Sequence, residues 1–122
     1  MKMVKAVIAD DDEQLRLFLK SKLIQVWPDL EICGEAENGV RALELIQSIQ
    51  PDVAFLDIRM PGLSGMEIAK KVGTMCRIVF VSASERYAIE AFENEALDYL
   101  LKPVTEQRLE KTVARFKVEL NI

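Results

Sequence analysis

The sequence predicts an α/β domain built on a doubly wound parallel sheet of five strands, with five helices on its two faces. Strand-like and helix-like segments alternate five times along 122 residues, and the connections between them are only a few residues long. The strand segments are apolar throughout rather than alternating with polar residues. Strands have this pattern when helices cover both faces of a parallel sheet, so we expect that architecture.

The first strand and the first helix are predicted from residues 3–9 and the segment that follows them. The strand is a continuous apolar run that stops at three acids, residues 10–12. Apolar residues then recur at helical spacing until Pro28 ends the pattern. The positions of this stripe are Leu15, Phe18, Leu19, Leu23 and Val26.

A second strand and a second helix are predicted between residues 30 and 51. Residues 30–36, LEICGEA, form a weaker strand candidate. Asn38 is a suitable N-cap for a helix that Pro51 ends. The apolar positions of this helix are Val40, Leu43, Ile46 and Ile49.

The third strand is residues 52–57, DVAFLD, and turn residues follow it directly. MPGLSG leads into a short helix, MEIAKKVG, for which Gly73 is the expected C-terminal stop. The connection from this helix to the next strand is short, which predicts a truncated third helix or a tight turn.

The last two strands are predicted at residues 76–83, CRIVFVSA, and 97–101, LDYLL. Between them, ERYAIEAFEN reads as a helix with Ala88, Ala91 and Phe92 on one side. A turn at residues 102–103 leads to the final helix. Its inward stripe is Leu109, Val113, Phe116 and Leu120.

Length and composition fit one domain, residues 1–122, because half of the residues are apolar and suffice for a single core. No apolar stretch reaches the roughly 18 to 20 residues that span a bilayer. The first ten residues also lack the apolar region and cleavage site of a signal peptide. We therefore predict a cytoplasmic domain without a membrane partner.

The charged and reactive residues exclude several functions. A formal net charge of −4 argues against direct binding of nucleic acid, which relies on clustered lysine and arginine. The absence of histidine removes every mechanism that needs an imidazole base or ligand. Cys33 and Cys76 lie in apolar runs without CxxC spacing, so we predict buried, reduced thiols.

Charged and hydroxyl side chains stand where four of the predicted strands end. The first strand is followed by Asp10 and Asp11, the third ends on Asp57, the fourth ends on Ser82, and Lys102 follows the fifth. Ligands of an open parallel sheet bind outside the carboxyl ends of its strands. We therefore expect these five side chains to share one crevice.

Three carboxylates in one crevice repel one another unless a cation is present. Oxygen ligands without histidine suit Mg²⁺, which commonly serves phosphate chemistry. A carboxylate can itself be the nucleophile and form an aspartyl-phosphate. Asp57 is the candidate, since it lies alone at the end of the central apolar strand while Asp10 and Asp11 share the metal. Ser82 and Lys102 can supply a hydrogen bond and a positive charge to the phosphoryl oxygens.

Four motifs, in this order and spacing, carry a resemblance to a known family. VIADDDEQLR, PDVAFLDIRMPGLSG, IVFVSA and DYLLKP resemble the response-regulator receiver domain of two-component signalling over essentially the whole chain. The stretch YAIEAFENEALDYLLKPV followed by RLEKTV looks most like receivers of the LytTR subclass. Regulators of that subclass usually carry a C-terminal DNA-binding output domain, which the 122 residues do not include.

The resemblance implies a flavodoxin-like fold with strand order 2-1-3-4-5. It also implies a regulatory phosphoacceptor, not an enzyme, that receives its phosphoryl group from a histidine kinase and assists its own phosphorylation and dephosphorylation. A homodimer through the fourth helix, fifth strand and fifth helix is the implied assembly. The site residues so implied are Asp57 as phosphoacceptor, Asp10, Asp11, Asp57 and the backbone carbonyl of Arg59 as Mg²⁺ ligands, Ser82 as switch hydroxyl, Tyr99 as switch aromatic, and Lys102 as the phosphoryl contact before a cis Pro103.

Each assignment has a structural alternative. The paired acids Asp10 and Asp11 could cap the first helix, Ser82 could be a strand-end hydroxyl, Lys102 a solvated turn lysine and Tyr99 a packing residue. Ser82 also stands where threonine is more frequent in the family. For the next acid along the chain, residue 12, we favour a role at the helix N-terminus over a metal role.

Two other functions compete with the receiver. A Mg²⁺-dependent aspartyl-phosphate phosphatase also places a nucleophilic aspartate at the end of a central strand, but it needs an acid two residues later, where this chain has Arg59. A flavodoxin-type electron carrier needs a phosphate-binding loop after the first strand, where the three acids would repel the flavin phosphate. A histidine phosphocarrier is excluded because the chain has no histidine.

Overall fold

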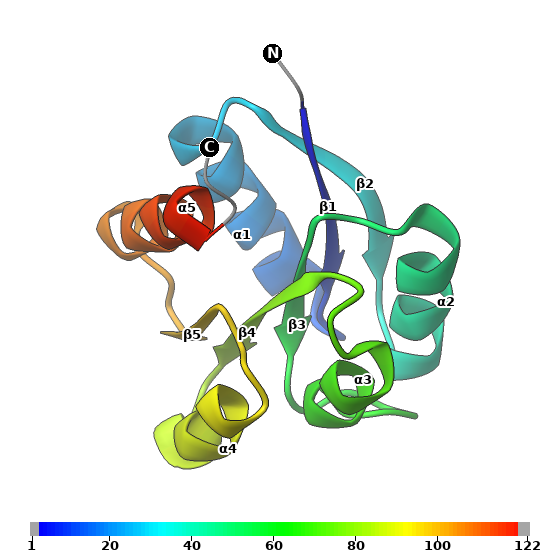
Figure 1. Cartoon of the computed structure of the whole chain (residues 1–122). Helices are drawn as coiled ribbons and strands as arrows, with labels where there is room; N and C mark the ends of the chain where they lie inside the picture. The colour runs from blue at the N-terminus through cyan, green and yellow to red at the C-terminus, as the bar shows by residue number, and fades with distance from the viewer. Residues whose placement is uncertain (1–2, 120–122) are drawn as a thin grey trace.

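A computed structural model describes residues 3–119 and contains one five-stranded parallel sheet in the order β2-β1-β3-β4-β5 (Figure 1). Within these residues, four α-helices and one short 3₁₀ helix connect the strands, and a fifth α-helix follows the last strand. The predicted flavodoxin-like class and strand order are therefore confirmed. The elements are β1 (Val4–Ala9), α1 (Glu13–Val26), β2 (Leu30–Ala36), α2 (Gly39–Ile49), β3 (Val53–Asp57), α3 (Gly65–Val72), β4 (Arg77–Ser82), η1 (Glu85–Tyr87), α4 (Ala88–Glu93), β5 (Asp98–Leu101) and α5 (Glu106–Glu119).

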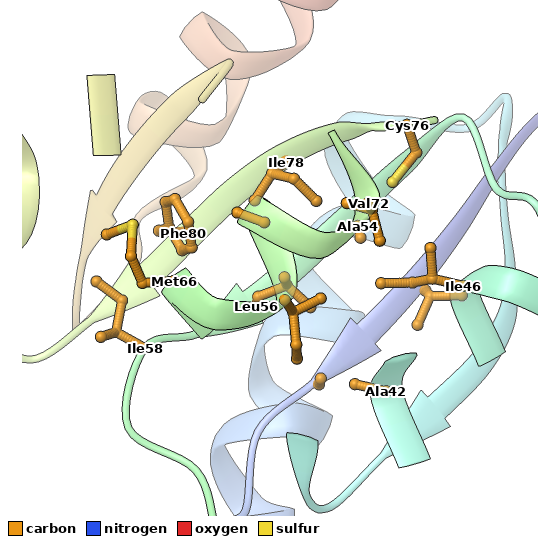
Figure 2. Packing of buried hydrophobic residues seen from close by; sticks show 14 of the residues in the cluster. Ala42, Ile46, Ala54, Leu56, Ile58, Met66, Val72, Cys76, Ile78 and Phe80 are labelled. Atoms are coloured by element: carbon orange, nitrogen blue, oxygen red, sulfur yellow. The ribbon is translucent and has the colours of Figure 1, made fainter. Parts of the chain in front are cut away.

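The core consists of two apolar layers, one on each face of the sheet. Helices α1 and α5 lie together on one face, where Trp27 and Phe116 meet edge to face with ring centroids 5.0 Å apart (Figure 1). Helices α2, α3 and α4 cover the other face with residues such as Ile46, Ile68 and Ala91. Figure 2 shows side chains of this second layer converging from α2, α3, β3 and β4. The central strands are thus buried on both sides, as their apolar sequences predict.

Local capping explains where the helices begin and end. Asp12 accepts hydrogen bonds from the N–H groups of Gln14 and Leu15 and so caps α1, which confirms its favoured role. Asn38 caps α2 as predicted, with its side chain accepting from the N–H of Arg41. Helix α3 is short, as the sequence indicates, and Gly73 follows its last residue.

The helix predicted at residues 85–94 differs in its first turn. Residues 85–87 form the 3₁₀ helix η1, whose N-cap is Ser84, and α4 itself is only six residues long. The tighter first turn follows from this cap, because the Ser84 hydroxyl accepts from the N–H of Arg86 and closes the turn locally.

Several predicted inward positions are exposed. Leu15 and Phe18 of α1, Val40 of α2 and Phe92 of α4 are between 37% and 52% exposed, and Cys33 is only half-buried. The spacing indicates a helix correctly but not how wide a face the sheet covers, and smaller residues such as Ala42 occupy the buried positions instead. Leu120, predicted on the inward stripe of α5, lies outside the described residues.

Cys76 fits the prediction of a buried, reduced thiol. It lies in the layer of Figure 2, and burial raises the pKa of its thiol to about 11. Among residues 3–119, no helix combines the length and the apolar character needed to cross a bilayer.

Candidate functional site

The parallel sheet brings the ends of four strands to one edge. Asp57 is the last residue of β3 and pairs in register with Val81, so Ser82 stands one residue beyond it at the end of β4. The backbone N–H of Lys102 donates to the carbonyl of Ser82 (2.9 Å), which fixes the residue after β5 beside the end of β4. Asp10 comes directly after the last residue of β1, as Lys102 comes directly after the last residue of β5. The predicted crevice at the carboxyl ends of the strands therefore exists.

Lys102 joins the two buried carboxylates of this edge. Its Nζ lies 2.9 Å from Oδ2 of Asp10 and 3.2 Å from Oδ2 of Asp57. Both aspartates are less than a tenth exposed, and the lysine side chain is only 15% exposed. Lys102 is therefore not a solvated turn residue, and the bond before Pro103 is cis as expected.

The three acids fit a divalent cation. One carboxylate oxygen each from Asp10, Asp11 and Asp57 lies within 4.8 Å of the others. Three carboxylates and the ammonium of Lys102 together carry a net charge of −2, which one Mg²⁺ would balance. Because Asp12 caps α1, helix capping does not occupy Asp11, whose side chain remains exposed. Oxygen donors alone favour a hard ion.

The surroundings of Asp57 raise the pKa of its carboxyl group although Lys102 is bonded to it. Burial raises the pKa of Asp57, and the charge of Asp10 raises it further, against the opposing effect of Lys102. For Lys102, burial lowers the pKa, but the hydrogen bonds and charges of the two aspartates outweigh burial and raise it. The ammonium therefore stays charged and holds the carboxylates in place.

The loop after β4 is tied to two candidate switch residues. The hydroxyl oxygen of Ser82 accepts a hydrogen bond from the N–H of Ser84 (3.1 Å). The hydroxyl of Tyr99 donates to the carbonyl of Ser84, and the Tyr99 ring lies near Phe80, with centroids 6.3 Å apart. Tyr99 is thus a buried packing residue in this structure. A switching role for Ser82 and Tyr99 stays a prediction.

Arg59 lies at the mouth of the site with its side chain in solvent. Its backbone N–H donates to Oδ1 of Asp57 (3.3 Å), and its Nη2 donates to the hydroxyl of Tyr87 (3.5 Å). Use of its carbonyl as a metal ligand stays a prediction. Two residues after Asp57, an aspartyl-phosphate phosphatase would need an acid, and this chain places a cation there.

Two glycines of the site were not singled out by sequence reasoning. A Cβ on Gly65, the first residue of α3, would lie 2.4 Å from the backbone carbonyl oxygen of Asp57. A Cβ on Gly39 would lie 1.8 Å from the carbonyl oxygen of Leu63. The close approach lets α3 pack directly beneath the end of β3. The sequence contained an indication of the close approach at Gly65. This residue is the second glycine of MPGLSG and is not needed for the turn itself.

Two clefts flank the acidic crevice. One, of about 700 Å³, lies between the loop after β3 and α4 and is lined by residues that include Asp11, Arg59 and Tyr87. The other, of about 350 Å³, is mainly apolar and is lined in part by Phe18 and Lys102. The exposed positions of α1 noted above, Leu15 and Phe18, are walls of this second cleft.

Comparison with known proteins agrees with this geometry. Residues 6–114 match the family model described as the response regulator receiver domain. Members of this family are phosphorylated on an aspartate by histidine kinases and bind Mg²⁺ in an acidic pocket.

Two curated relatives share nearly half of the aligned residues. An uncharacterized response regulatory protein of Vibrio cholerae is 45% identical over 118 residues, which are 94% of this chain and 45% of that protein. The transcriptional regulatory protein BtsR of Escherichia coli K12 is 46% identical over 123 residues, 96% of this chain and 49% of that protein. The chain thus spans about half the length of these relatives.

Solved structures show the same fold. The REC domain of AraT, a response regulator from Geobacillus stearothermophilus, superposes with a TM-score of 0.88 at 33% identity, covering 98% of this chain and 96% of that one. The response regulatory domain of mrkE from Klebsiella pneumoniae gives a TM-score of 0.87 at 31% identity, covering 96% and 98%. Fold, family model and relatives agree, and the chain belongs to the response-regulator receiver domain family of two-component signalling.

Proposed function

We propose that Asp57 is the residue that accepts the phosphoryl group in this receiver. The observation that carries the proposal is the position of its carboxylate at the end of β3, bonded to Lys102 and within 4.8 Å of carboxylate oxygens of Asp10 and Asp11. A buried carboxylate is costly unless charge compensates it, and here the compensating groups are also those that phosphate chemistry needs.

The transfer itself requires little from the protein beyond positioning. A carboxylate oxygen of Asp57 attacks the phosphorus of a phosphohistidine, and the phosphorus–nitrogen bond breaks as the phosphorus–oxygen bond forms. The N–H of Arg59 and the ammonium of Lys102 orient the two oxygens of Asp57 beforehand. Lys102 can then donate to a phosphoryl oxygen. Mg²⁺, held by Asp10, Asp11, Asp57 and the carbonyl of Arg59, would neutralise charge on the phosphoryl oxygens.

We propose that Ser82 and Tyr99 transmit the phosphorylation signal. Ser82 is bonded to the N–H of Ser84, and Tyr99 to the carbonyl of the same residue. If the Ser82 hydroxyl turns toward a phosphoryl oxygen, its bond to Ser84 breaks and the loop must move. Because Tyr99 bonds to the carbonyl of the same Ser84, movement of the loop also acts on the Tyr99 ring. Both residues thus bias the position of this loop, which is the two-state element.

The output surface proposed here is the face of α4, β5 and α5, which would pair two receivers. On α4 and β5, three large apolar side chains are exposed: Ile89 (77%), Phe92 (51%) and Leu101 (44%). Their position next to the strand that carries Tyr99 links the surface to the site. Ile89 and Phe92 are three residues apart on α4 and so share one face of that helix, and grouped exposed apolar side chains mark interaction surfaces more often than isolated ones do.

The proposal is tested by intact-mass measurement after incubation with acetyl phosphate. We expect one phosphoryl adduct per chain in the presence of Mg²⁺, and none when EDTA removes the ion or when Asp57→Asn replaces the acceptor. Asp52→Asn is the matched control, because Asp52 lies at the opposite end of the same strand, where it accepts from the N–H of Lys5. An adduct that survives Asp57→Asn would refute the assignment.

A second experiment, hydrolysis of p-nitrophenyl phosphate, separates the receiver from the phosphatase alternative. We propose that the chain stores the phosphoryl group and assists its gain and loss, rather than turning over a separate substrate. A phosphatase would hydrolyse p-nitrophenyl phosphate rapidly and repeatedly, whereas this chain should release further p-nitrophenol no faster than the adduct on Asp57 decays. Release that requires Asp57 and is much faster than this decay would favour the phosphatase.

We further propose that the domain controls an output unit of the kind found in transcriptional regulators of the LytTR subclass. The sequence resemblance and the name of the relative BtsR, a transcriptional regulatory protein, support this. Residues 1–122 alone should not retain duplex DNA in a mobility-shift assay, because the net charge is −4. Salt-dependent retention of DNA by these residues would contradict the separation of receiver and output.

A further inference from the structure

A buried carboxylate lies outside the acidic crevice, on β5. Asp98 is completely inaccessible to solvent, yet it faces cations and a hydroxyl from α5 rather than apolar groups. Arg108 donates to it twice, through Nη1 at 2.8 Å and Nη2 at 2.6 Å. Thr112 Oγ1 donates at 2.7 Å, and Arg115 Nη1 at 2.9 Å. Asp98 thus connects one strand to three turns of one helix.

The same ion pair also holds the backbone of Tyr99. The N–H of Tyr99 donates to Oδ1 of Asp98 (2.8 Å), and Nη2 of Arg108 donates to the carbonyl of Tyr99 (3.4 Å). Strand β5 is an edge strand of the sheet, so only β4 pairs with it. Both backbone polar groups of Tyr99 are therefore held by Asp98 and Arg108, while the hydroxyl of its ring is held by Ser84.

The ion pair is stable at neutral pH. Burial raises the pKa of Asp98, but the hydrogen bonds from Arg108, Thr112 and the N–H of Tyr99 outweigh burial and leave the pKa below its ordinary value. The partner responds in the opposite direction, since the hydrogen bond to Asp98 raises the pKa of Arg108. Both groups stay charged, and the contact between β5 and α5 persists throughout the physiological range.

We propose that Arg108 is a positioning residue for Tyr99: together with Asp98 it fixes the Tyr99 backbone and so determines where the Tyr99 ring meets Ser84. The inference rests on the proposed function, in which Tyr99 responds to phosphorylation. Arg108, not Arg115, has this role because its guanidinium reaches both the Asp98 carboxylate and the Tyr99 carbonyl. Arg115 contacts the carboxylate alone and is half exposed.

The inference makes α5 part of the switch and not only a support for it. If the backbone of Tyr99 is fixed, its ring can rotate and exchange the hydrogen bond of its hydroxyl without moving β5. If Arg108 is lost, the strand can shift with the ring, and the position of the ring is no longer defined by Ser84 alone. The surface of β5 and α5 would then respond to phosphorylation differently, although the site at Asp57 is unchanged.

The test is fluorine NMR of Tyr99. The chain has two tyrosines, so Tyr87→Phe in protein labelled with 3-fluorotyrosine leaves a single resonance from Tyr99. In this background, Arg108→Met is compared with Lys111→Met, which removes the same charge from an exposed position of the same helix. Each is recorded before and after addition of Mg²⁺ with beryllofluoride, an analogue of the phosphoryl group.

We expect Arg108→Met to shift or split the Tyr99 resonance in the resting state and to alter its response to beryllofluoride, while Lys111→Met leaves both unchanged. Arg108→Lys should shift the resonance in the same direction but less, because lysine keeps the charge beside Asp98 but lacks the planar fork with which Arg108 reaches both the carboxylate and the carbonyl. Arg108→Lys keeps a positive charge beside the buried carboxylate of Asp98, so it can replace Arg108→Met in the test if that variant fails to fold. Fluorescence of Trp27, which packs on Phe116, reports whether α5 remains docked.

The inference is overturned if folded Arg108→Met and Arg108→Lys give the same Tyr99 resonance as Lys111→Met. Failure of the proposed function is recognised separately. If acetyl phosphate yields no adduct on Asp57 in any variant, the phosphoacceptor assignment is wrong, yet the resting-state resonances still decide whether Arg108 positions Tyr99.

Discussion

Lys102 lies between Asp10 and Asp57, with its ammonium nitrogen 2.9 Å from one carboxylate and 3.2 Å from the other. One cation therefore compensates two acids that a divalent ion would also bind. If Mg²⁺ binds here as proposed, the lysine competes with it for these two carboxylates. Lys102 would then have opposite effects on metal binding and on phosphorylation.

Lys102→Met should tighten Mg²⁺ binding while lowering the yield of phosphoprotein. Loss of two charge-assisted hydrogen bonds removes the competitor for the carboxylates, which we expect to improve Mg²⁺ affinity about tenfold. Without the ammonium, the pKa of Asp57 rises further, since Lys102 lowers it in the wild type. Calorimetric titration with Mg²⁺ measures the first effect. The control is Lys20→Met, which breaks the ion pair between Lys20 of α1 and Glu35 of β2. Equal Mg²⁺ affinities of the wild type, Lys102→Met and Lys20→Met would contradict the prediction.

Gly65→Ala should destabilise the domain although alanine is the better helix former. The added Cβ would lie 2.4 Å from the Asp57 carbonyl oxygen, a backbone atom that cannot move aside easily. Such overpacking costs about 1 to 3 kcal/mol of the free energy of unfolding. Urea denaturation measures this. Gly34→Ala should cost less, because its Cβ would meet the movable end of the Ile49 side chain at 3.2 Å, and an equal cost at both positions would disprove the backbone argument.

Stability should depend on pH through Asp98. Its folded-state pKa is lower than the ordinary 3.8, so the ionised carboxylate contributes stability above that pH and loses the contribution as pH falls through the folded-state pKa. Asp98→Asn should cost about 3 kcal/mol at pH 7, and the difference from wild type should shrink below about pH 4.

Denaturation curves between pH 3 and pH 7 measure this dependence. Glu44→Gln is the control, because Glu44 forms an exposed pair with Arg41 that solvent screens. A cost of Asp98→Asn that is the same at every pH would show that the carboxylate contributes by shape rather than by charge.

Ile89→Glu should block dimer formation through the face of α4, β5 and α5. A charge at a position that is 77% exposed is harmless in the monomer but is desolvated when two receivers pair. Size-exclusion chromatography with light scattering, with and without beryllofluoride and Mg²⁺, measures the mass. Val40→Glu changes an exposed valine on α2 and should not affect pairing. A dimer that forms with Ile89→Glu would place the interface elsewhere.

Much of the site was predictable because strand ends converge in a parallel sheet. The sequence places Asp57 at the end of an apolar run and Lys102 after another, and parallel pairing alone brings them to one edge. The N-cap Asn38 and the stop at Gly73 were likewise determined locally, by side-chain capping and by backbone freedom.

The features that were missed depend on the third dimension. The spacing of Leu15 and Phe18 indicates a helix, but their exposure depends on a cleft between α1 and the loop after β5. The contact of Gly65 with the Asp57 backbone depends on how closely α3 approaches β3. The pair of Asp98 and Arg108 depends on the rotation of α5 about its own axis, which periodicity does not determine to within one side chain.

The occupied backbone of Tyr99 also removes a point at which a strand of another chain could pair with β5. A free N–H and carbonyl on the outermost strand of a sheet can template the addition of a strand from another chain. On β5 these groups already bond Asp98 and Arg108, and the guanidinium adds charge at this edge. If receivers associate through helix and side-chain surfaces next to this strand, they can approach and separate repeatedly without their sheets fusing into a continuous one.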